Sequence, residues 1–320
     1  MTILQDQISF YKSVYVNDGL SNGGRISNTL ITDNSLDNLF RNIQSAERIS
    51  GITLYRKMFI KNENPENISL ENPRVFIENV NSGEDYYQIA LGTYQDNQVN
   101  AIAITDWHGS GRLLNRLSSG ESSFSVLCKQ ASGYPSTGSV IISDGLQQAE
   151  CVLLNAPSWN GTHVSLVISG EVGLNFAADS IVSAVLPISE LKPAIAYWTE
   201  TSVSGVFDDD IYPVTLFNIG TVDESWTITF LNATTFNVTG ASIGSLGSGL
   251  ISANFAPVNG SSYYFSIDKN AWSGSWIVGD VITFNTVQAA QGIWIKESVP
   301  VGSGSQANNL CQLGIIGESA

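Results

Sequence analysis

Histidine is the side chain that most often activates a nucleophile, and this sequence of 320 residues contains only two. His108 lies in the pattern Asp-Trp-His-Gly-Ser, which has the residue types of a carboxylate, histidine and serine set. Neighbouring side chains on a strand point to opposite faces, so these three groups are not expected to converge. His163 follows Asn-Gly-Thr and is expected at a turn or strand end. The histidines therefore do not predict a catalytic site.

The consecutive carboxylates at 208–210 are the strongest metal-binding candidates, because carboxylate oxygens are ligands for hard cations such as calcium. Asp208, Asp210 and Asp223 are the candidate ligands. The run lacks the alternating Asp-x-Asp-x-Asp-Gly pattern of a dedicated calcium loop, which favours a solvated turn. Two acids are enough for glycoside cleavage, but no motif singles out a pair. The glycines at 244–249 have no accompanying lysine for a phosphate. We expect no cofactor and no catalytic residue.

Tryptophans on a β-sandwich can form a platform on which sugar rings stack. Most of the seven tryptophans lie in strand-like apolar surroundings, which favours packing in a core. Trp159 and Trp272 lie in loops rich in Asn, Gly and Ser, and they are the candidates for exposed aromatic side chains.

The elements that would position these residues are mainly β-strands. Residues 225–231, 263–267 and 281–284 cluster β-branched and aromatic residues between Gly, Asn, Asp and Ser. Helical periodicity predicts one helix over 35–48, capped by Ser35, and a second short one over 111–117. The sequence therefore predicts an all-β protein of two or three β-sandwich or small-barrel domains with an N-terminal arm and a short helix.

Turn signals divide the chain into three blocks. Residues 1–97 are expected to form an N-terminal arm plus a β-sandwich, residues 98–190 a small β-barrel-like module, and residues 191–320 a C-terminal β-sandwich. Each block has the length of an ordinary domain.

The charge pattern argues against nucleic-acid binding. Net charge is −15, only 13% of the residues are charged, and all seven arginines lie at or before Arg116. No basic patch is available to neutralise phosphates. We expect neither a signal peptide nor a membrane span, because no apolar stretch approaches about 18 residues. A lightly charged polar surface suits extensive protein contacts, since few charges must be desolvated.

Three widely spaced cysteines leave more than one interpretation open. Cys128, Cys151 and Cys311 show no Cys-x-x-Cys motif, and reduced buried thiols are the favoured interpretation. A bridge between Cys128 and Cys151, or a bridge between subunits, is the alternative.

Two parts of the chain carry a likeness to a known family. The N-terminal part contains residues 10–14 (FYKSV), 22–27 (NGGRIS) and 55–62 (YRKMFIKN), and the C-terminal part contains residues 212–214, 218–221, 224–230 and 254–259. Both parts resemble uncharacterised virion structural proteins of tailed double-stranded-DNA phages and prophages. The turn from Tyr134 to Gly138 is similar to small modules of phage tail and fibre proteins. The resemblance implies particle assembly and brings no catalytic residues with it.

The resulting hypothesis is a non-enzymatic structural component of a tailed-phage virion, assembled in the host cytoplasm. Its partners would be copies of itself and other virion proteins, and a tail or baseplate-proximal position is the first choice. Arg25, Arg48 and Arg56 are the expected intersubunit ion-pair residues, because they lie in the block that most resembles an assembly region. The alternatives are a capsid decoration protein, an adhesin that binds a host surface glycan or other receptor, and an enzyme with converging carboxylates or a histidine in a cleft.

Overall fold

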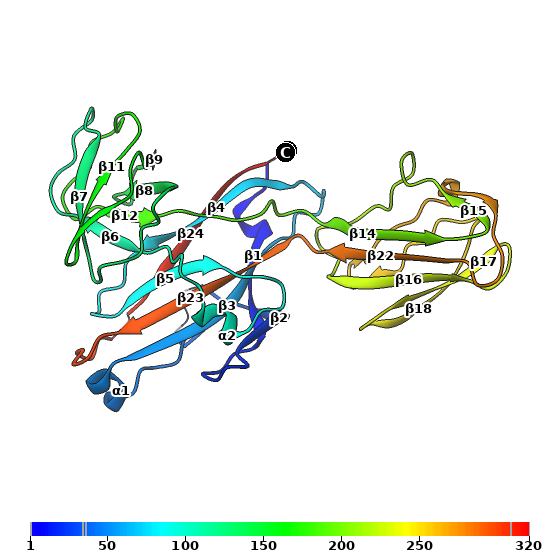
Figure 1. Ribbon diagram of the computed structural model, residues 1–320, viewed down its shortest axis with the longest axis horizontal. Coiled ribbons are helices and arrows are strands. Elements are labelled where there is room, and N and C mark those ends of the chain that lie inside the picture. The colour runs from blue at the N-terminus through cyan, green and yellow to red at the C-terminus, as the bar shows by residue number, and fades with distance from the viewer. Residues whose placement is uncertain (1, 34, 36, 308, 320) are drawn as a thin grey trace.

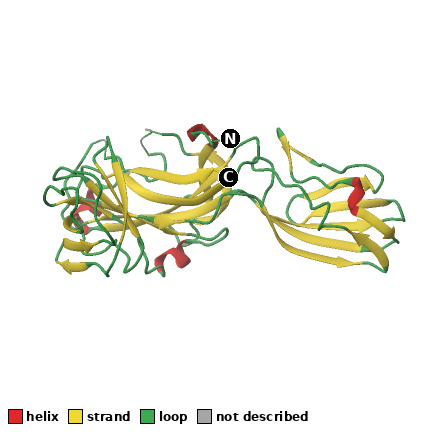
Figure 2. Cartoon of the chain, turned by 90° about the horizontal axis from the view of Figure 1, so that it is seen from above, coloured by secondary structure: helices red, strands yellow, loops and turns green. Residues whose placement is uncertain are grey.

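A central body with two inserted modules forms an elongated molecule (Figures 1 and 2). The computed structural model describes residues 2–33, 35, 37–307 and 309–319. Residues up to 108, 186–193 and 288–319 form the central body, which contains both ends of the chain. Residues 109–185 form the barrel and residues 194–287 form the sandwich. The described residues contain 24 strands and two short α-helices, so the predicted all-β class is confirmed.

Two sheets form the central body, and all their strands are antiparallel. The larger sheet has the strand order β2 (Gly23–Leu30), β1 (Ile8–Tyr15), β3 (Ile52–Asn62), β23 (Ala290–Val299) and β5 (Tyr86–Leu91). The smaller sheet has the order β13 (Leu186–Pro187), β4 (Leu70–Asn79) and β24 (Gln312–Ser319). Met58, Ile60 and Ile293 from the larger sheet pack in one core with Val75 from β4. Both faces of β3 and β23 are largely buried, because Trp107 and Trp294 pack on the opposite side of the larger sheet.

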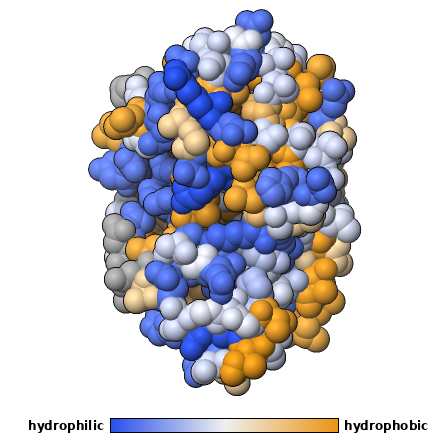
Figure 3. Space-filling view, turned by 90° about the vertical axis from the view of Figure 1, so that its left-hand side faces the viewer, coloured by the Kyte–Doolittle hydropathy of each residue, from blue (hydrophilic) through white to orange (hydrophobic). Residues whose placement is uncertain are grey.

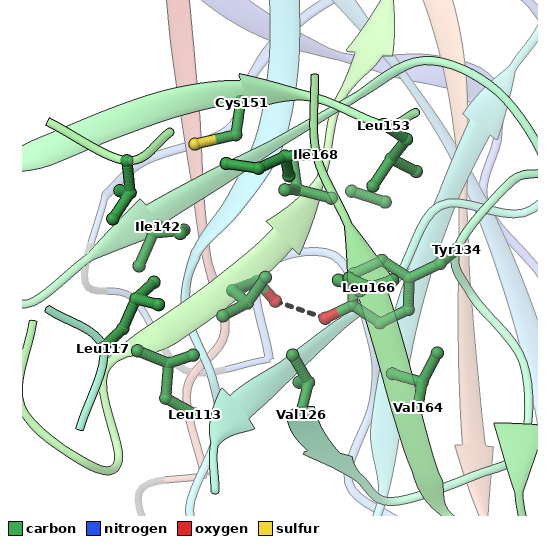
Figure 4. Close-up of a cluster of buried hydrophobic side chains, with 14 of the residues drawn as sticks. Leu113, Leu117, Val126, Tyr134, Ile142, Cys151, Leu153, Val164, Leu166 and Ile168 are labelled. Carbon is green, nitrogen blue, oxygen red and sulfur yellow. Dashed lines mark hydrogen bonds between the residues drawn. The ribbon is translucent and has the colours of Figure 1, made fainter. Parts of the chain in front are cut away.

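The barrel follows β5 and returns the chain to the central body at β13. Its strands have the order β10 (Ser158–Asn160), β11 (His163–Val167), β7 (Ser123–Cys128), β6 (Ser110–Leu113), β12 (Ile181–Ala184), β8 (Ser139–Ser143) and β9 (Gln148–Val152). The Leu154 and Ser169 amides donate to Val167 O and Val152 O, both over 2.8 Å, which links the end of β9 to β11. Inside the barrel, the Tyr134 hydroxyl donates to Val182 O over 2.6 Å (Figure 4).

The sandwich is built around a five-stranded sheet and an aromatic core. The sheet order is β14 (Ala194–Thr201), β22 (Val281–Val287), β16 (Glu224–Phe230), β17 (Thr235–Gly240) and β18 (Gly244–Leu250). Two small sheets complete the module: β15 (Ser204–Phe207) with β21 (Trp272–Ser275), and β19 (Val258–Asn259) with β20 (Ser262–Tyr263). Alternate side chains of β16 are buried, as period-2 patterning requires. Phe230 stacks on Trp276 with ring centroids 4.2 Å apart.

Polar contacts fix both modules to the central body. On the barrel side, Lys129 Nζ donates to three main-chain oxygens, those of Asn81 (2.9 Å), Gly83 (2.5 Å) and Asp85 (2.9 Å), and to Asn81 Oδ1 over 3.1 Å. On the sandwich side, the Asn218 amide donates to Asn67 Oδ1 over 2.9 Å. These bonds connect each module to the central body.

The predicted helices differ from the structure. Only the end of the 35–48 segment is helical, in α1 (Ser45–Ser50), and residues 34 and 36 lie outside the described part of the chain. The Leu39 carbonyl instead accepts a bond from Arg56 Nε over 3.0 Å. The second predicted helix begins in strand β6, where Gly111 lies against β7 and a Cβ would be 2.6 Å from Leu127 O. A short helix that was not predicted, α2, covers Gln98–Ile102.

Strand pairing also divides the chain differently from the three sequence blocks. β23 and β24 belong to the block predicted as the C-terminal sandwich, but they pair with β3, β5 and β4 of the first block. The segment predicted as an N-terminal arm contributes β1 and β2 to the larger sheet. The described residues contain no helix long and apolar enough to cross a membrane.

Candidate binding cleft

A cleft of about 1290 Å³ lies between the two sheets of the central body, beside β24. β24 itself lines the cleft, together with residues 2–5, 31–33 and 37–43. Apolar side chains from both sheets line it, including Phe10, Met58, Ile295, Leu313 and Ile315. We call this space the β24 cleft.

The β24 cleft runs along the edge of its strand. Six consecutive residues of β24, from 312 to 317, line the cleft. Successive side chains of a strand point to opposite faces, so a cleft over one face would be lined by every second residue only. Among the described residues, β24 pairs with β4 alone. The free edge of β24 therefore faces the cleft with its backbone donors and acceptors.

Two carboxyl groups, Glu297 and Asp85, lie together in the lining of this cleft. Glu297 is on β23, and its register partner on β5 is Tyr87, whose hydroxyl donates to Glu297 Oε1 over 2.9 Å. Asp85 lies just before β5, and Asn309 Nδ2 donates to both of its carboxylate oxygens, over 2.6 and 2.7 Å. We call Asp85 and Glu297 the carboxyl pair.

The environment of Glu297 favours its protonated form. Burial, together with Asp85 within hydrogen-bonding reach, raises the pKa of Glu297 to about 7, although the Tyr87 hydroxyl and the Arg56 charge oppose the rise. The side chain is 4% exposed, and its Oε2 atom has no hydrogen-bond partner. This oxygen can share a proton with Asp85 or accept a bond from a donor that enters the cleft.

Cys311 also lines the cleft, but it is not a suitable nucleophile. Burial raises the pKa of its thiol to about 12, and the charges of Asp85 and Glu297 contribute to the rise. The thiolate is the reactive form of cysteine, and it is scarce at neutral pH for such a group. The cleft is therefore better suited to binding than to covalent catalysis.

The candidate metal ligands do not form a cation site in the described residues, where no cluster of three metal-ligating side chains occurs. Asp208 Oδ1 accepts the Ile211 amide over 3.0 Å, as in a turn. Asp223 accepts Gln288 Nε2 over 2.5 Å, and burial raises its pKa to about 6. Asp210 is exposed.

The three candidate interface arginines have different environments. Arg25 is exposed, and its guanidinium lies 5.6 Å from the centre of the Tyr94 ring. Arg48 is half-buried and donates to Ile43 O over 2.8 Å. Arg56 is buried and pairs with Asp18 over 2.5 Å within the chain, because it faces the interior of the central body. Only Arg25 is freely presented to another subunit.

The two tryptophans predicted to be exposed are both packed. Trp272 is 9% exposed, and its ring lies 4.8 Å from that of Phe207, so the prediction for Trp272 is wrong. Its loop-like sequence neighbours are part of β21, which covers the aromatic core. Trp159 is half-buried against the barrel core, 6.0 Å from the Tyr134 ring. Neither residue contributes to an open stacking platform.

The three cysteines and His108 have structural rather than catalytic environments. Cys128, Cys151 and Cys311 are free thiols, and the first two lie in the barrel core. His108 is 5% exposed, and its backbone pairs with Ile89. Burial lowers its pKa, which favours the neutral imidazole.

Sequence reasoning did not identify the carboxyl pair. A signal was present, because Ile293, Ile295 and Glu297 occupy alternate positions of one strand and place a carboxylate on an apolar face. Its partner Asp85 is more than 200 residues away in the chain, and pairing over that distance leaves no local pattern. Comparisons with protein-family models, with curated protein sequences and with solved structures found no match to this chain.

Proposed function

We propose that this protein is a non-enzymatic structural component of a tailed-phage virion, in a tail or baseplate-proximal position, which assembles through contacts between subunits. The observation that carries the proposal is the free edge of β24 beside an apolar cleft. Unpaired strand edges pair readily with other chains, and soluble proteins usually cover them. The sequence likeness to virion proteins is the reason for placing this assembly surface in a phage particle.

The shape of the molecule supports an assembly role. The barrel and the sandwich extend from different ends of the central body and are fixed to it by polar contacts (Figure 1). An elongated subunit presents contact surfaces that are far apart, which suits a component of a large particle.

Apolar side chains are exposed at both ends of the molecule. Figure 3 shows them in patches between polar residues on the barrel end, where Leu146 is 96% exposed. At the sandwich, Val203 and Ile277 are exposed and are held close together, because both their amides donate to the Asp280 carboxylate. Exposed apolar patches often mark protein interaction sites.

The geometry of the carboxyl pair disfavours a glycosidase as the enzyme alternative. Glycosidases separate their two carboxyl groups by roughly 5 Å or more, so that the sugar or a water fits between them. Asp85 is instead within hydrogen-bonding reach of Glu297, and Asn309 occupies both Asp85 oxygens. A capsid decoration protein remains the second candidate, since the same free edge would serve it. The packed tryptophans remove the observation that favoured a glycan-binding adhesin.

Light scattering of the purified protein over a range of concentrations, followed by electron microscopy, tests the assembly proposal. We expect a defined oligomer, ring or tube, alone or on mixing with the neighbouring proteins of the same particle. Labelling with an antibody to the protein would then place it in the tail or in the head. A protein that stays monomeric in both conditions and is missing from purified particles would contradict the proposal.

A further inference from the structure

We propose that the β24 cleft is a docking site for an extended, apolar segment of a partner protein, which adds a strand to β24 and places one Lys or Arg side chain against the carboxyl pair. This inference deepens the proposed function, on which its biological setting rests. Its test needs only the purified full-length protein.

The cleft has the form that strand addition requires. An extended peptide that joins a sheet edge gains main-chain hydrogen bonds, and pockets for its alternate side chains provide specificity. The eight residues of β24 offer a free edge, and Phe10, Met58 and Ile295 provide an apolar surface beside it. The volume of about 1290 Å³ exceeds the range of roughly 300–1,000 Å³ that is typical of small-molecule pockets. A polypeptide segment therefore suits the cleft better than a small ligand.

Electrostatics selects a basic segment. Glu297 is 4% exposed, and its Oε2 atom has no hydrogen-bond partner. The carboxyl group of Asp85 lies next to it and adds a second acceptor for a cation. The described lining contains six acidic residues and two arginines. Both arginines are engaged within the chain, since Arg41 pairs with Asp18 and Glu47, and Arg48 donates to Ile43 O. A second copy of this chain, with its net charge of −15, is a less suitable source of the segment than a basic partner.

The incoming cation would replace a proton. In the free protein, the pair can hold one proton on Glu297 Oε2, which then donates to the Asp85 carboxylate. When an ammonium or guanidinium group arrives, that proton leaves for the solvent and both carboxylates accept bonds from the cation. Binding near neutral pH would then release up to one proton for each segment bound.

A random nonapeptide library, screened against the immobilised full-length protein, is the test. We expect enrichment of peptides with alternating apolar residues and one Lys or Arg, and binding of the selected peptide at least tenfold tighter than that of its Lys-to-Leu counterpart. Glu297→Gln should abolish this preference. Glu66→Gln is the matched control, because Glu66 is an exposed carboxylate of the central body outside the cleft lining, and this variant should leave the preference intact. The melting temperature of each variant checks folding.

Two further measurements on the selected peptide test the binding mode. Calorimetry in buffers of different ionisation enthalpy should show proton release with the wild type and none with Glu297→Gln. Backbone N-methylation of one alternate set of peptide residues should abolish binding, whereas methylation of the other set should not. A screen without enrichment, a selection without cationic residues, or equal effects of both methylated sets would overturn the inference. If the protein assembles but selects no basic peptide, the docking inference is refuted and the proposed function stands.

Discussion

Replacing Glu297 by glutamine should make the protein more stable at alkaline pH and change little at acidic pH. Glutamine has nearly the same shape and can still accept the Tyr87 hydroxyl bond, but it cannot ionise. The wild-type carboxyl is buried beside Asp85, and its pKa is raised from 4.5 to about 7. A difference of about 2.5 in pKa, at roughly 1.4 kcal/mol for each unit, corresponds to ~3 kcal/mol.

The direction of the pH dependence follows from proton binding. Between pH 4.5 and about 7, the folded protein keeps the Glu297 proton that the unfolded chain has released. The folded state therefore binds more protons, and its stability falls as the pH rises through this range. Below pH 4.5 both states are protonated, and above pH 7 both are ionised, so the contribution of Glu297 is constant outside the range.

Urea unfolding of wild type and Glu297→Gln at several values from pH 4.5 to 8.5, followed by tryptophan fluorescence, measures this effect. The comparison uses the transition of the central body, which contains Trp107 and Trp294. We expect the stability difference in favour of the variant to grow by ~3 kcal/mol between pH 4.5 and 8. Glu78→Gln removes an exposed carboxylate and should give a flat difference. A Glu297→Gln difference that does not change with pH would refute the assignment of a buried, protonated carboxyl.

Three further predictions concern packing and the junctions between modules. Lys129→Met removes the donor to three main-chain oxygens and Asn81 Oδ1, and we expect a loss of about 1–3 kcal/mol and faster proteolysis at the junction of barrel and central body. Equal proteolysis rates for wild type and variant would contradict this role of Lys129. Trp272→Ala should lower the free energy of unfolding of the sandwich by about 3–5 kcal/mol, because the ring is buried among other aromatic rings. A loss below about 1 kcal/mol would contradict its place in the core. Cys128 and Cys151 should react with a thiol reagent only after unfolding, since burial raises the pKa of both thiols, and fast labelling of the folded protein would show that the barrel opens.

The local sequence was sufficient for the strand content but not for the pairing of strands. Runs such as 225–231 identify strands because β-branched and aromatic side chains alternate with polar ones. β23 is recognisable as a strand from its run Ile293-Trp-Ile, but nothing in its residues says that it pairs with β3, more than 200 residues earlier, rather than with its neighbour β22. Only Gln288 and Ala289 separate β22 from β23, so no turn signal marks the return to the central body.

The incorrect predictions have identifiable causes in tertiary structure. Leu39 and Phe40 have helical spacing with Ile43, but they pack against the central core in an irregular segment. Trp272 has loop-like neighbours because its strand, β21, is short and at the periphery, although its ring points into the aromatic core. Arg56 was expected on an interface, whereas its position opposite Ile295 on the inner face of the larger sheet gives it partners within the chain.

The attachment of the sandwich has a consequence for evolution. The sandwich begins with β14 and ends with β22, and the first residue of one, Ala194, is the register partner of the last residue of the other, Val287. The chain therefore leaves and re-enters the central body at nearly the same point. A recombination event that replaced residues 194–287 with another domain of neighbouring ends, or with a short turn, would leave the sheets and the cleft of the central body intact. The gene can thus exchange this distal domain while the part of the protein that contains the cleft stays the same.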